Sequence, residues 1–319
     1  MTQPHLSPDS SDPQTRFPIG ECSSGWLFPL RRAVKRWGYG AIALLLASTI
    51  VVSTPSTSQA IDFGDIFNIL RNGIRVYQLS NLSDRQEVEL GEQIDRQLKR
   101  SQIRVITSPD VVAYVDDIGQ RLARNSNRPN IPYQFQVVRD AKVNAFATMG
   151  GFVYINAGLM VAADNEAQLS GVISHEIGHI TERHAVNQMR QRAIAQGVAS
   201  AAGLDRSRAV QIGVELALNR PKSRRDELEA DDLGLTYLNR AGYAPQALPN
   251  FLRKLLRASS PPTILSTHPN TGDRIALLEA KIAQIPESQR GKEGLNELEY
   301  RKRIDGWFKI TPANSQRRR

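Results

Sequence analysis

The fold that we expect for this chain follows first from the residues His175-Glu176-Ile177-Gly178-His179. Apolar residues recur around it at steps of three and four, which predicts a helix with one buried side that begins near Asn165. These apolar positions are Leu169, Val172, Ile173, Ile177 and Ile180. Because about 3.6 residues make one helical turn, His175 and His179 face the same way and can bind one cation through two imidazoles. Glu176 lies beside them, placed to reach a water molecule at that cation.

A second helical stretch, residues 223–234, offers a third ligand for the cation. Glu227 and Asp231 are four residues apart and therefore share one face. One carboxylate can bind the metal, and the other can accept the Nδ1–H of a ligand histidine and fix its tautomer. We assign Glu227 as the third ligand and Asp231 as the partner of His175. Glu229 is two residues from Glu227, so we expect it to point elsewhere and to be solvated.

Two histidines and one acidic residue suit a catalytic zinc, which keeps its fourth position for water. We therefore expect one Zn²⁺ per chain, with Glu176 as the general base that accepts a proton from water. His184 comes nine residues after His175, which turns it to the opposite face of a continuous helix, so we expect a structural or surface histidine. The metzincin class is excluded, because Glu182 and Ala185 occupy the positions of its glycine and third histidine.

Several further motifs occur in a fixed order around these residues. They are Asn144–Ala147, Gly150–Leu159, Ser223-Arg224 with Glu227 and Ala230-Asp231, and Ser266–Pro269. Together with the HExxH stretch they resemble the gluzincin metallopeptidases, which include the CAAX prenyl endopeptidase, the HtpX heat-shock protease and the BepA-type periplasmic proteases. The resemblance runs from about Asp84 to about Ile285 and implies a protease domain, a zinc ion and endopeptidase action on proteins. Two departures are Met149, where the family usually has proline, and the absence of a following tetratricopeptide array.

The fold class that we expect is α+β, a mainly helical zincin-like metallopeptidase domain over residues 84–285. Tyr133–Val138 and Val143–Ile155 are β-rich and supply a small sheet, which we expect to be antiparallel. The residues Gly150, Gly151, Phe152 and Val153 can form an edge strand that binds an extended peptide by strand addition. A plain core strand is the alternative for this segment.

His268 lies in the stretch Ser266–Pro269, which resembles the His-Pro loop of the family. Two functional roles stay open for this histidine. Near the zinc it could stabilise the oxyanion of the tetrahedral intermediate, or it could occupy the open coordination position in a resting state. A histidine that merely precedes the next helix is the third possibility.

Residues 1–60 have the pattern of a secretory leader. Basic residues 31–36 precede an apolar run at 41–52, and Ser58-Gln59-Ala60 offers a cleavage point, so we expect cleavage after Ala60 and export to a periplasm or a thylakoid lumen. An uncleaved anchor is the alternative, although the run is shorter than the roughly twenty residues of a membrane span. The single cysteine, Cys22, lies in this leader, which leaves the mature chain without a thiol.

Two further segments flank the expected domain. Residues 61–83 form an amphipathic N-terminal segment, which we expect to pack against the protease core or to lie on a membrane surface. Residues 286–319 read as a polar, basic and loosely packed tail. The net charge is +9, but no basic–aromatic motif accompanies it, so nucleic-acid binding is excluded as the function.

These patterns predict an exported zinc metalloendopeptidase that acts on unfolded or misassembled envelope proteins in quality control. Its partners would be protein or peptide substrates in an extended conformation, and its oligomeric state is left open. The alternative is a zinc-containing holdase or assembly factor that binds extended chains with little turnover. The intact Glu176 favours the enzyme, because a binding module would keep its function after Glu176→Gln whereas a protease would not.

Overall fold

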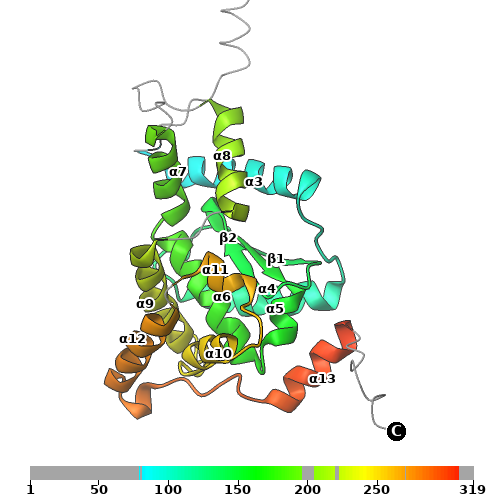
Figure 1. Ribbon diagram of the computed structural model, residues 1–319, viewed down its shortest axis with the longest axis vertical. Helices are drawn as coiled ribbons and strands as arrows, with labels where there is room; N and C mark the ends of the chain where they lie inside the picture. Colours follow the sequence, from blue (N-terminus) through cyan, green and yellow to red (C-terminus); the bar gives the residue numbers. More distant parts are fainter. Residues whose placement is uncertain (1–78, 80, 196–204, 220–222, 270, 309–319) are drawn as a thin grey trace, which may run out of the picture. The chain divides into compact units, whose positions relative to one another are not determined.

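The computed structural model describes residues 79, 81–195, 205–219, 223–269 and 271–308 (Figure 1). The expected leader and nearly all of the amphipathic segment 61–83 lie outside these residues. Within the described part, none of the helices has the length and apolar character that a membrane crossing requires.

Within the described residues, two helices precede the sheet. Helix α3 (Asp84–Ser101) begins with a capping box, in which the Ser83 Oγ accepts from the Gln86 backbone N–H and the Gln86 side chain accepts from the Ser83 N–H. Helix α4 (Pro109–Arg124) begins at the proline that the sequence places at a first helical position. Each helix has a buried apolar face.

The sheet has three strands, β1 (Gln134–Val138), β2 (Ala145–Ala147) and β3 (Phe152–Asn156), in the order β1-β3-β2. Strand β3 pairs with β2 in antiparallel and with β1 in parallel orientation. The small sheet and the mainly helical fold are confirmed, but the sheet is mixed and not purely antiparallel. The chain reverses once before β2 and once after it, so β3 runs in the direction of β1 again.

The strand order corrects the prediction that Phe152 and Val153 form a substrate-binding edge strand. Strand β3 is central, and all of its residues are buried. The turn that contains Gly150 and Gly151 is buried as well, and these glycines have φ angles of 76° and 99°, which few other residues adopt. The sheet edge that lies against α6 (Glu166–Thr181) is instead β2.

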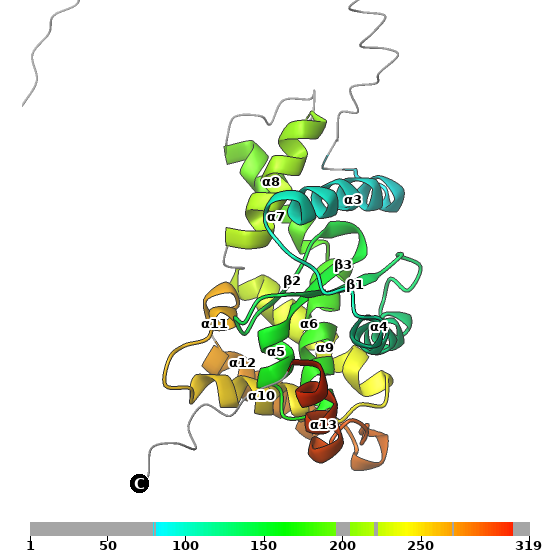
Figure 2. The same cartoon turned by 90° about the vertical axis from the view of Figure 1, so that its right-hand side faces the viewer.

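The sheet separates two apolar cores because successive side chains of a strand point to opposite faces. Val153 and Ile155 join a core with α4, α6 and helix α9 (Arg224–Arg240). Phe152 and Tyr154 join a second core with α3, α7 (His184–Ala195) and α8 (Arg206–Asn219). Figures 1 and 2 show α3, α7 and α8 on one side of the sheet, with α5 (Ala157–Ala162) and α6 on the other.

Helices α6 and α9 pack closely at two glycines. A Cβ added to Gly178 of α6 would lie 2.7 Å from the Ala230 carbonyl oxygen of α9. A Cβ added to Gly234 of α9 would lie 2.9 Å from the backbone of His175. The backbones of the two helices therefore approach more closely than any side chain would allow, which brings the HExxH face beside Glu227.

The C-terminal part continues with α10 (Ala247–Leu256), α11 (Thr263–Thr267), α12 (Thr271–Gln284), the short 3-10 turn η2 (Glu287–Gln289) and α13 (Glu297–Phe308). The expectation of a loosely packed tail is wrong for α13. Tyr300 and Ile304 are buried, and the Tyr300 hydroxyl donates to the Met160 carbonyl at 2.6 Å. An apolar residue once per turn is a weak signal in a charged segment, so this buried side was missed.

Candidate metal centre

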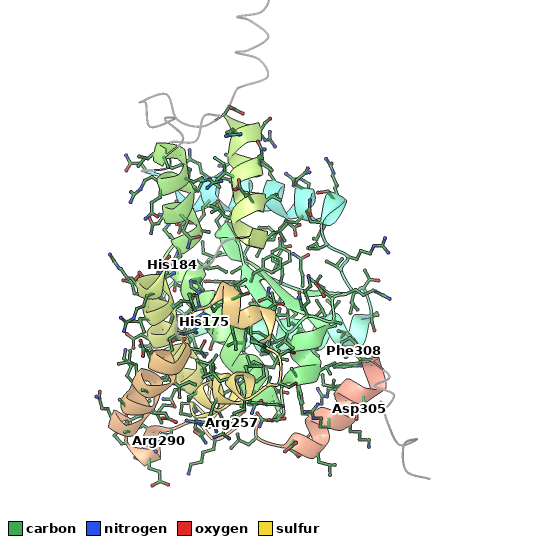
Figure 3. All side chains as sticks on the ribbon, in the orientation of Figure 1. His175, His184, Arg257, Arg290, Asp305 and Phe308 are labelled. Atoms are coloured by element: carbon green, nitrogen blue, oxygen red, sulfur yellow. The ribbon has the colours of Figure 1, made fainter. Side chains whose placement is uncertain are left out.

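Helix α6 supplies three side chains of the candidate site. The Asn165 side chain caps its N-terminus by accepting from the Gln168 N–H at 3.0 Å. His175, Glu176 and His179 lie two turns or more along the helix, and each is at most 3% exposed. His175, labelled in Figure 3, is buried, whereas Arg257 and Asp305 in the same view are exposed. The sequence stretch thus forms a buried site and not a solvated helix face.

Helix α9 supplies the acidic side chains. Ser223 caps it by accepting from the Asp226 N–H at 3.1 Å, and Glu227 and Asp231 then point toward α6. The Glu227 carboxylate lies 3.6 Å from His175 Nε2 and 3.4 Å from His179 Nε2. Both carboxylates are buried, as the shared helix face predicts.

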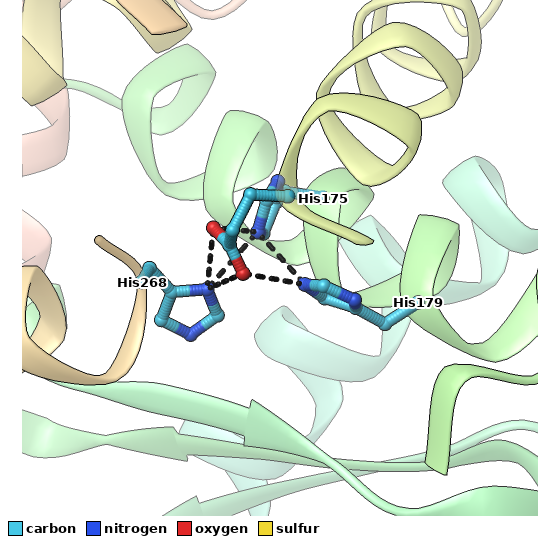
Figure 4. Close-up of side chains that lie close together, drawn as sticks. His175, His179 and His268 are labelled. Atoms are coloured by element: carbon cyan, nitrogen blue, oxygen red, sulfur yellow. Dashed lines mark hydrogen bonds and ion pairs between the residues drawn. The ribbon is translucent and has the colours of Figure 1, made fainter. Parts of the chain in front are cut away.

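The atoms that could bind a metal ion lie close together between helices α6 and α9 (Figure 4). The Nε2 atoms of His175 and His179 lie 3.1 Å apart. In both rings the other nitrogen, Nδ1, faces a polar partner, so the lone pairs at Nε2 and the carboxylate of Glu227 point toward one another. Such a set of mutually repelling acceptors fits a divalent cation, and two imidazoles with one carboxylate is a zinc ligand set.

His268 lies in the same cluster. Its Nδ1 lies 3.1 Å from His175 Nε2 and 3.1 Å from both oxygens of Glu227, and its Nε2 lies 3.4 Å from the Glu176 carboxylate. Four ligand atoms, one each from His175, His179, Glu227 and His268, lie within 4.8 Å of one another. The third possibility for His268, a histidine that merely precedes a helix, therefore does not describe its position.

The electrostatics of the acidic side chains follow from these contacts. Burial alone would raise the pKa of Glu227, but the charge of His268 and the neighbouring His179 and His175 hold this pKa well below its usual range. Burial would likewise raise the pKa of Asp231, yet hydrogen bonds from Arg274 and His175 lower it. Both carboxyl groups are therefore ionised at neutral pH, as a metal ligand and its supporting acceptor require.

Arg274 of α12 is a residue of the site that the sequence reasoning missed. It is 2% exposed and donates to both oxygens of Asp231, at 2.7 and 2.8 Å. Its Nη1 lies 2.6 Å from Glu227 Oε2 and also donates to the His268 carbonyl at 3.2 Å. One guanidinium thus connects the acidic residues of α9 with the loop that carries His268. The only available signal was an arginine six residues after the histidine of the His-Pro loop.

The expected partnership between Asp231 and His175 is present in the structure. Asp231 Oδ1 lies 2.9 Å from His175 Nδ1.

His184 does not lie on the face of helix α6 opposite to the ligand histidines, where we expected it. It is 3% exposed, and its Nδ1 lies 2.8 Å from His179 Nδ1. Helix α6 ends at Thr181, and Arg183 has a φ angle of 55°, so the helical periodicity used for His184 does not apply.

Glu229 also differs from the expectation. Its side chain is 36% exposed, yet its Oε2 lies 3.1 Å from His184 Nε2, and its Oε1 accepts from Arg225 at 2.8 Å. It contacts His184 because α7 begins beside α9 and not in line with α6. Glu229 therefore borders the site instead of pointing away from it.

A family model for peptidase family M48 matches residues 109–282, which include every residue of the centre. The putative beta-barrel assembly-enhancing protease of Vibrio cholerae is 33% identical over 228 residues, which cover 65% of this chain and 46% of that protein. The beta-barrel assembly-enhancing protease of Escherichia coli K12 is 34% identical over 214 residues, 62% of this chain and 44% of that protein. The metalloprotease LoiP of the same organism is 28% identical over 244 residues, 73% of this chain and 94% of that protein.

The alignments with the two assembly-enhancing proteases thus span less than half of those proteins. The family match itself covers more than half of the present chain. It includes helix α6, helix α9 and the loop that carries His268. On this evidence of sequence and geometry, the chain belongs to peptidase family M48.

Proposed function

We propose that this protein is a zinc-dependent metalloendopeptidase that hydrolyses unfolded or misassembled envelope proteins. The observation that carries the proposal is the convergence of His175, His179 and Glu227 on one point, with Glu176 buried beside it. Family membership and the metalloprotease names of the relatives support the activity. The assembly-enhancing names of two relatives support an envelope substrate. Export rests on the leader pattern alone.

The roles of the residues follow from their positions. A zinc ion held by His175, His179 and Glu227 would supply Lewis acidity to a water molecule and to the scissile carbonyl. Glu176 accepts the proton of that water and returns it to the leaving amine. Asp231 and Arg274 hold the ligand His175 and the carboxylate of Glu227 in place. The centre is buried, which excludes bulk water and strengthens these interactions.

The substrate strand would pair with β2, because β2 is the sheet edge beside α6. In the present structure α11 contacts the two residues that precede β2. The Ile264 N–H donates to the Val143 carbonyl at 3.1 Å, and the Thr267 hydroxyl donates to the Asn144 side chain at 3.2 Å. A substrate strand that extended beyond β2 to Val143 would compete with α11 for the Val143 carbonyl. Of the roles left open for His268, this arrangement favours the resting-state ligand.

The proposal is tested by measuring metal content and casein cleavage of the purified full-length chain, wild type and Glu176→Gln. We expect about one zinc per chain in both proteins and cleavage by the wild type alone. Cleavage by both proteins would contradict the role of Glu176. A chain that binds no zinc would contradict the whole assignment.

The resting-state role is tested with His268→Ala, with Ser266→Ala of the same segment as the control. We expect His268→Ala to bind zinc and to cleave casein faster than wild type, and the control to match wild type. Slower cleavage by His268→Ala would indicate oxyanion stabilisation instead. If the wild type, His268→Ala and Ser266→Ala all bound zinc and none of them cleaved casein, the alternative function of a zinc-containing holdase would be supported.

A further inference from the structure

His175 and His179 each have a polar partner at the ring atom Nδ1, but the two partners are of different kinds. Asp231 Oδ1 lies 2.9 Å from His175 Nδ1, whereas His184 Nδ1 lies 2.8 Å from His179 Nδ1. On its other side, His184 Nε2 lies 3.1 Å from Glu229 Oε2. A metal-binding histidine usually donates its second N–H to a carboxylate, a carbonyl or water, so a second histidine in this place requires an explanation.

The proton positions follow from hydrogen-bond logic. A neutral histidine that binds a metal through Nε2 keeps its proton on Nδ1, so His179 donates and His184 must accept at its own Nδ1. His184 then carries its proton on Nε2, directed at Glu229. We propose that His184 and Glu229 are positioning residues for the metal ligand His179, connected as His179 Nδ1–H to His184 Nδ1 and His184 Nε2–H to the Glu229 carboxylate. This assignment rests on the metal centre of the proposed function.

Burial and the local backbone support this role. His184 is 3% exposed, and it follows the positive-φ residue Arg183, whose Nε donates to the buried Glu87 at 2.9 Å. The turn between α6 and α7 is therefore fixed, and the imidazole of His184 is directed back at His179. A surface histidine would need none of these contacts.

The same side chains suggest a second metal site as a rival explanation. Ligand atoms of His184, Asp226 and Glu229 lie within 4.8 Å of one another. A metal on Nε2 of His184 would move the ring proton to Nδ1, where it would face the Nδ1–H of His179 across 2.8 Å. Two donors cannot hydrogen-bond to each other, so simultaneous occupation of both sites is disfavoured. The observed distances fit the positioning role without a second ion.

The test is the zinc dissociation constant, measured by chelator competition on the full-length chain in a Glu176→Gln background that removes self-cleavage. We expect His184→Leu to weaken zinc binding by about 10- to 100-fold. His184→Asn is smaller than histidine but places an amide oxygen where Nδ1 was, so it should retain binding within about tenfold of the parent. Gln188→Ala, which removes a contact to Asp226 but none to His184, is the control and should bind as the parent does.

A second pair of variants covers the case in which His184→Leu fails to fold. Glu229→Ala and Glu229→Gln both remove the ion pair with Arg225, but only glutamine keeps an oxygen that can accept from His184. We expect the alanine variant alone to weaken zinc binding and to shift the visible absorption bands of the cobalt-substituted protein. Such bands report ligand geometry, which a merely structural role would leave unchanged.

The outcomes separate the failure of this assignment from that of the metal centre. A parent chain that binds no zinc would remove the proposed function. A parent that binds zinc with the same affinity as His184→Leu and Glu229→Ala would overturn the positioning role alone. Two zinc ions per parent chain, one of them lost in His184→Asn as well as in His184→Leu, would establish the second metal site in its place.

Discussion

Helices α3 and α13 both lie outside the residues that match the family, yet they contact the rest of the domain in different ways. Helix α3 brings the fully buried Glu87, which accepts from the Gly150 N–H at 3.1 Å and pairs with Arg128 and Arg183 at 2.9 Å. Helix α13 packs on α5 through Tyr300. The segment before the family match thus supports the metal centre, whereas the segment after it covers a helix remote from the ligands.

The connection from α3 to the centre runs through the end of the ligand helix. Arg128, held by Glu87, also donates to the Ile180 carbonyl at 3.0 Å, one residue after His179. Arg183, held by the same carboxylate, sets the turn that places His184. This charge network reaches the end of helix α6, whereas the polar contacts of α13 reach Met160 and Asp164, which precede that helix.

The largest expected effect is that of Glu87→Gln. It leaves two arginines beside a neutral amide, and removing one partner of a buried ion pair should lower the free energy of unfolding by about 3 kcal/mol. Denaturant titration measures this change, and casein cleavage should fall with it. The control is Glu92→Gln, which breaks an exposed pair with Arg96 on the same helix. Equal effects of the two variants would show that the buried ion pairs of Glu87 contribute no more to stability than an exposed pair does.

Gly150→Ala tests the other end of the same contact. An added Cβ would lie 2.7 Å from the Glu87 carbonyl and from Val88 Cα, and the φ angle of 76° is unfavourable for alanine. We expect a loss of about 2 kcal/mol of stability from strain and overpacking. The control Gly272→Ala, where the added methyl would meet nothing within 4 Å, should be nearly neutral. A neutral Gly150→Ala would show that the α3 contact can relax.

Tyr300→Phe probes α13. It removes the hydrogen bond to the Met160 carbonyl and should lower the free energy of unfolding by about 1 kcal/mol, with zinc affinity unchanged. Leu298→Ala on the same helix, at a residue that is 82% exposed, should change stability by less than about 0.5 kcal/mol. A loss of zinc affinity in Tyr300→Phe would erase the difference between the two helices.

The smallest expected effect concerns Asp164, which accepts from Arg301 of α13 at 3.0 Å and pairs with Lys254 of α10. Burial would raise the pKa of Asp164, but Lys254, Gln168 and Arg301 lower it. A lowered folded-state pKa stabilises the protein above the unfolded value of about 4, and this stability is lost as the pH falls through the folded-state pKa.

Unfolding measured at pH 7 and pH 3 should therefore show a smaller acid-dependent loss of stability in Asp164→Asn than in wild type. The difference should be at most about 1 kcal/mol, because the pair is partly exposed. The exposed Asp117, replaced by asparagine, serves as the control and should follow the wild type. An unchanged pH profile in Asp164→Asn would show that Arg301 adds nothing to the attachment of α13.

Helical periodicity predicted which residues of each of two helices share the face that forms the centre. The steps from His175 to His179 and from Glu227 to Asp231 each span about one turn, and the structure places all four side chains together. Periodicity failed at His184 because one residue, Arg183, leaves the helical region, and a single positive φ angle has no signature in an arginine. Arg274 was missed since long-range pairing with Asp231 depends on how α12 packs, which no local pattern encodes.

The sheet, too, was predicted from the sequence only in part. The β-rich segments that hold the three strands were predicted from side-chain type. Strand order was not, because β1 and β2 present comparable apolar faces and only the packing of both against β3 decides which becomes the edge. The substrate strand was therefore assigned to the central position.

The glycine contacts between α6 and α9 have a consequence for which ion the centre would select. Bonds from zinc to imidazole nitrogen are about 2.0–2.1 Å, and those from calcium to oxygen about 2.3–2.6 Å, so a few tenths of an ångström separate one ion from another. A methyl group at Gly178 or Gly234 would force a displacement of that size between the helices. Such a protein could remain folded and still exchange its preferred metal, which would make the spacing of two backbones a determinant of ion selectivity.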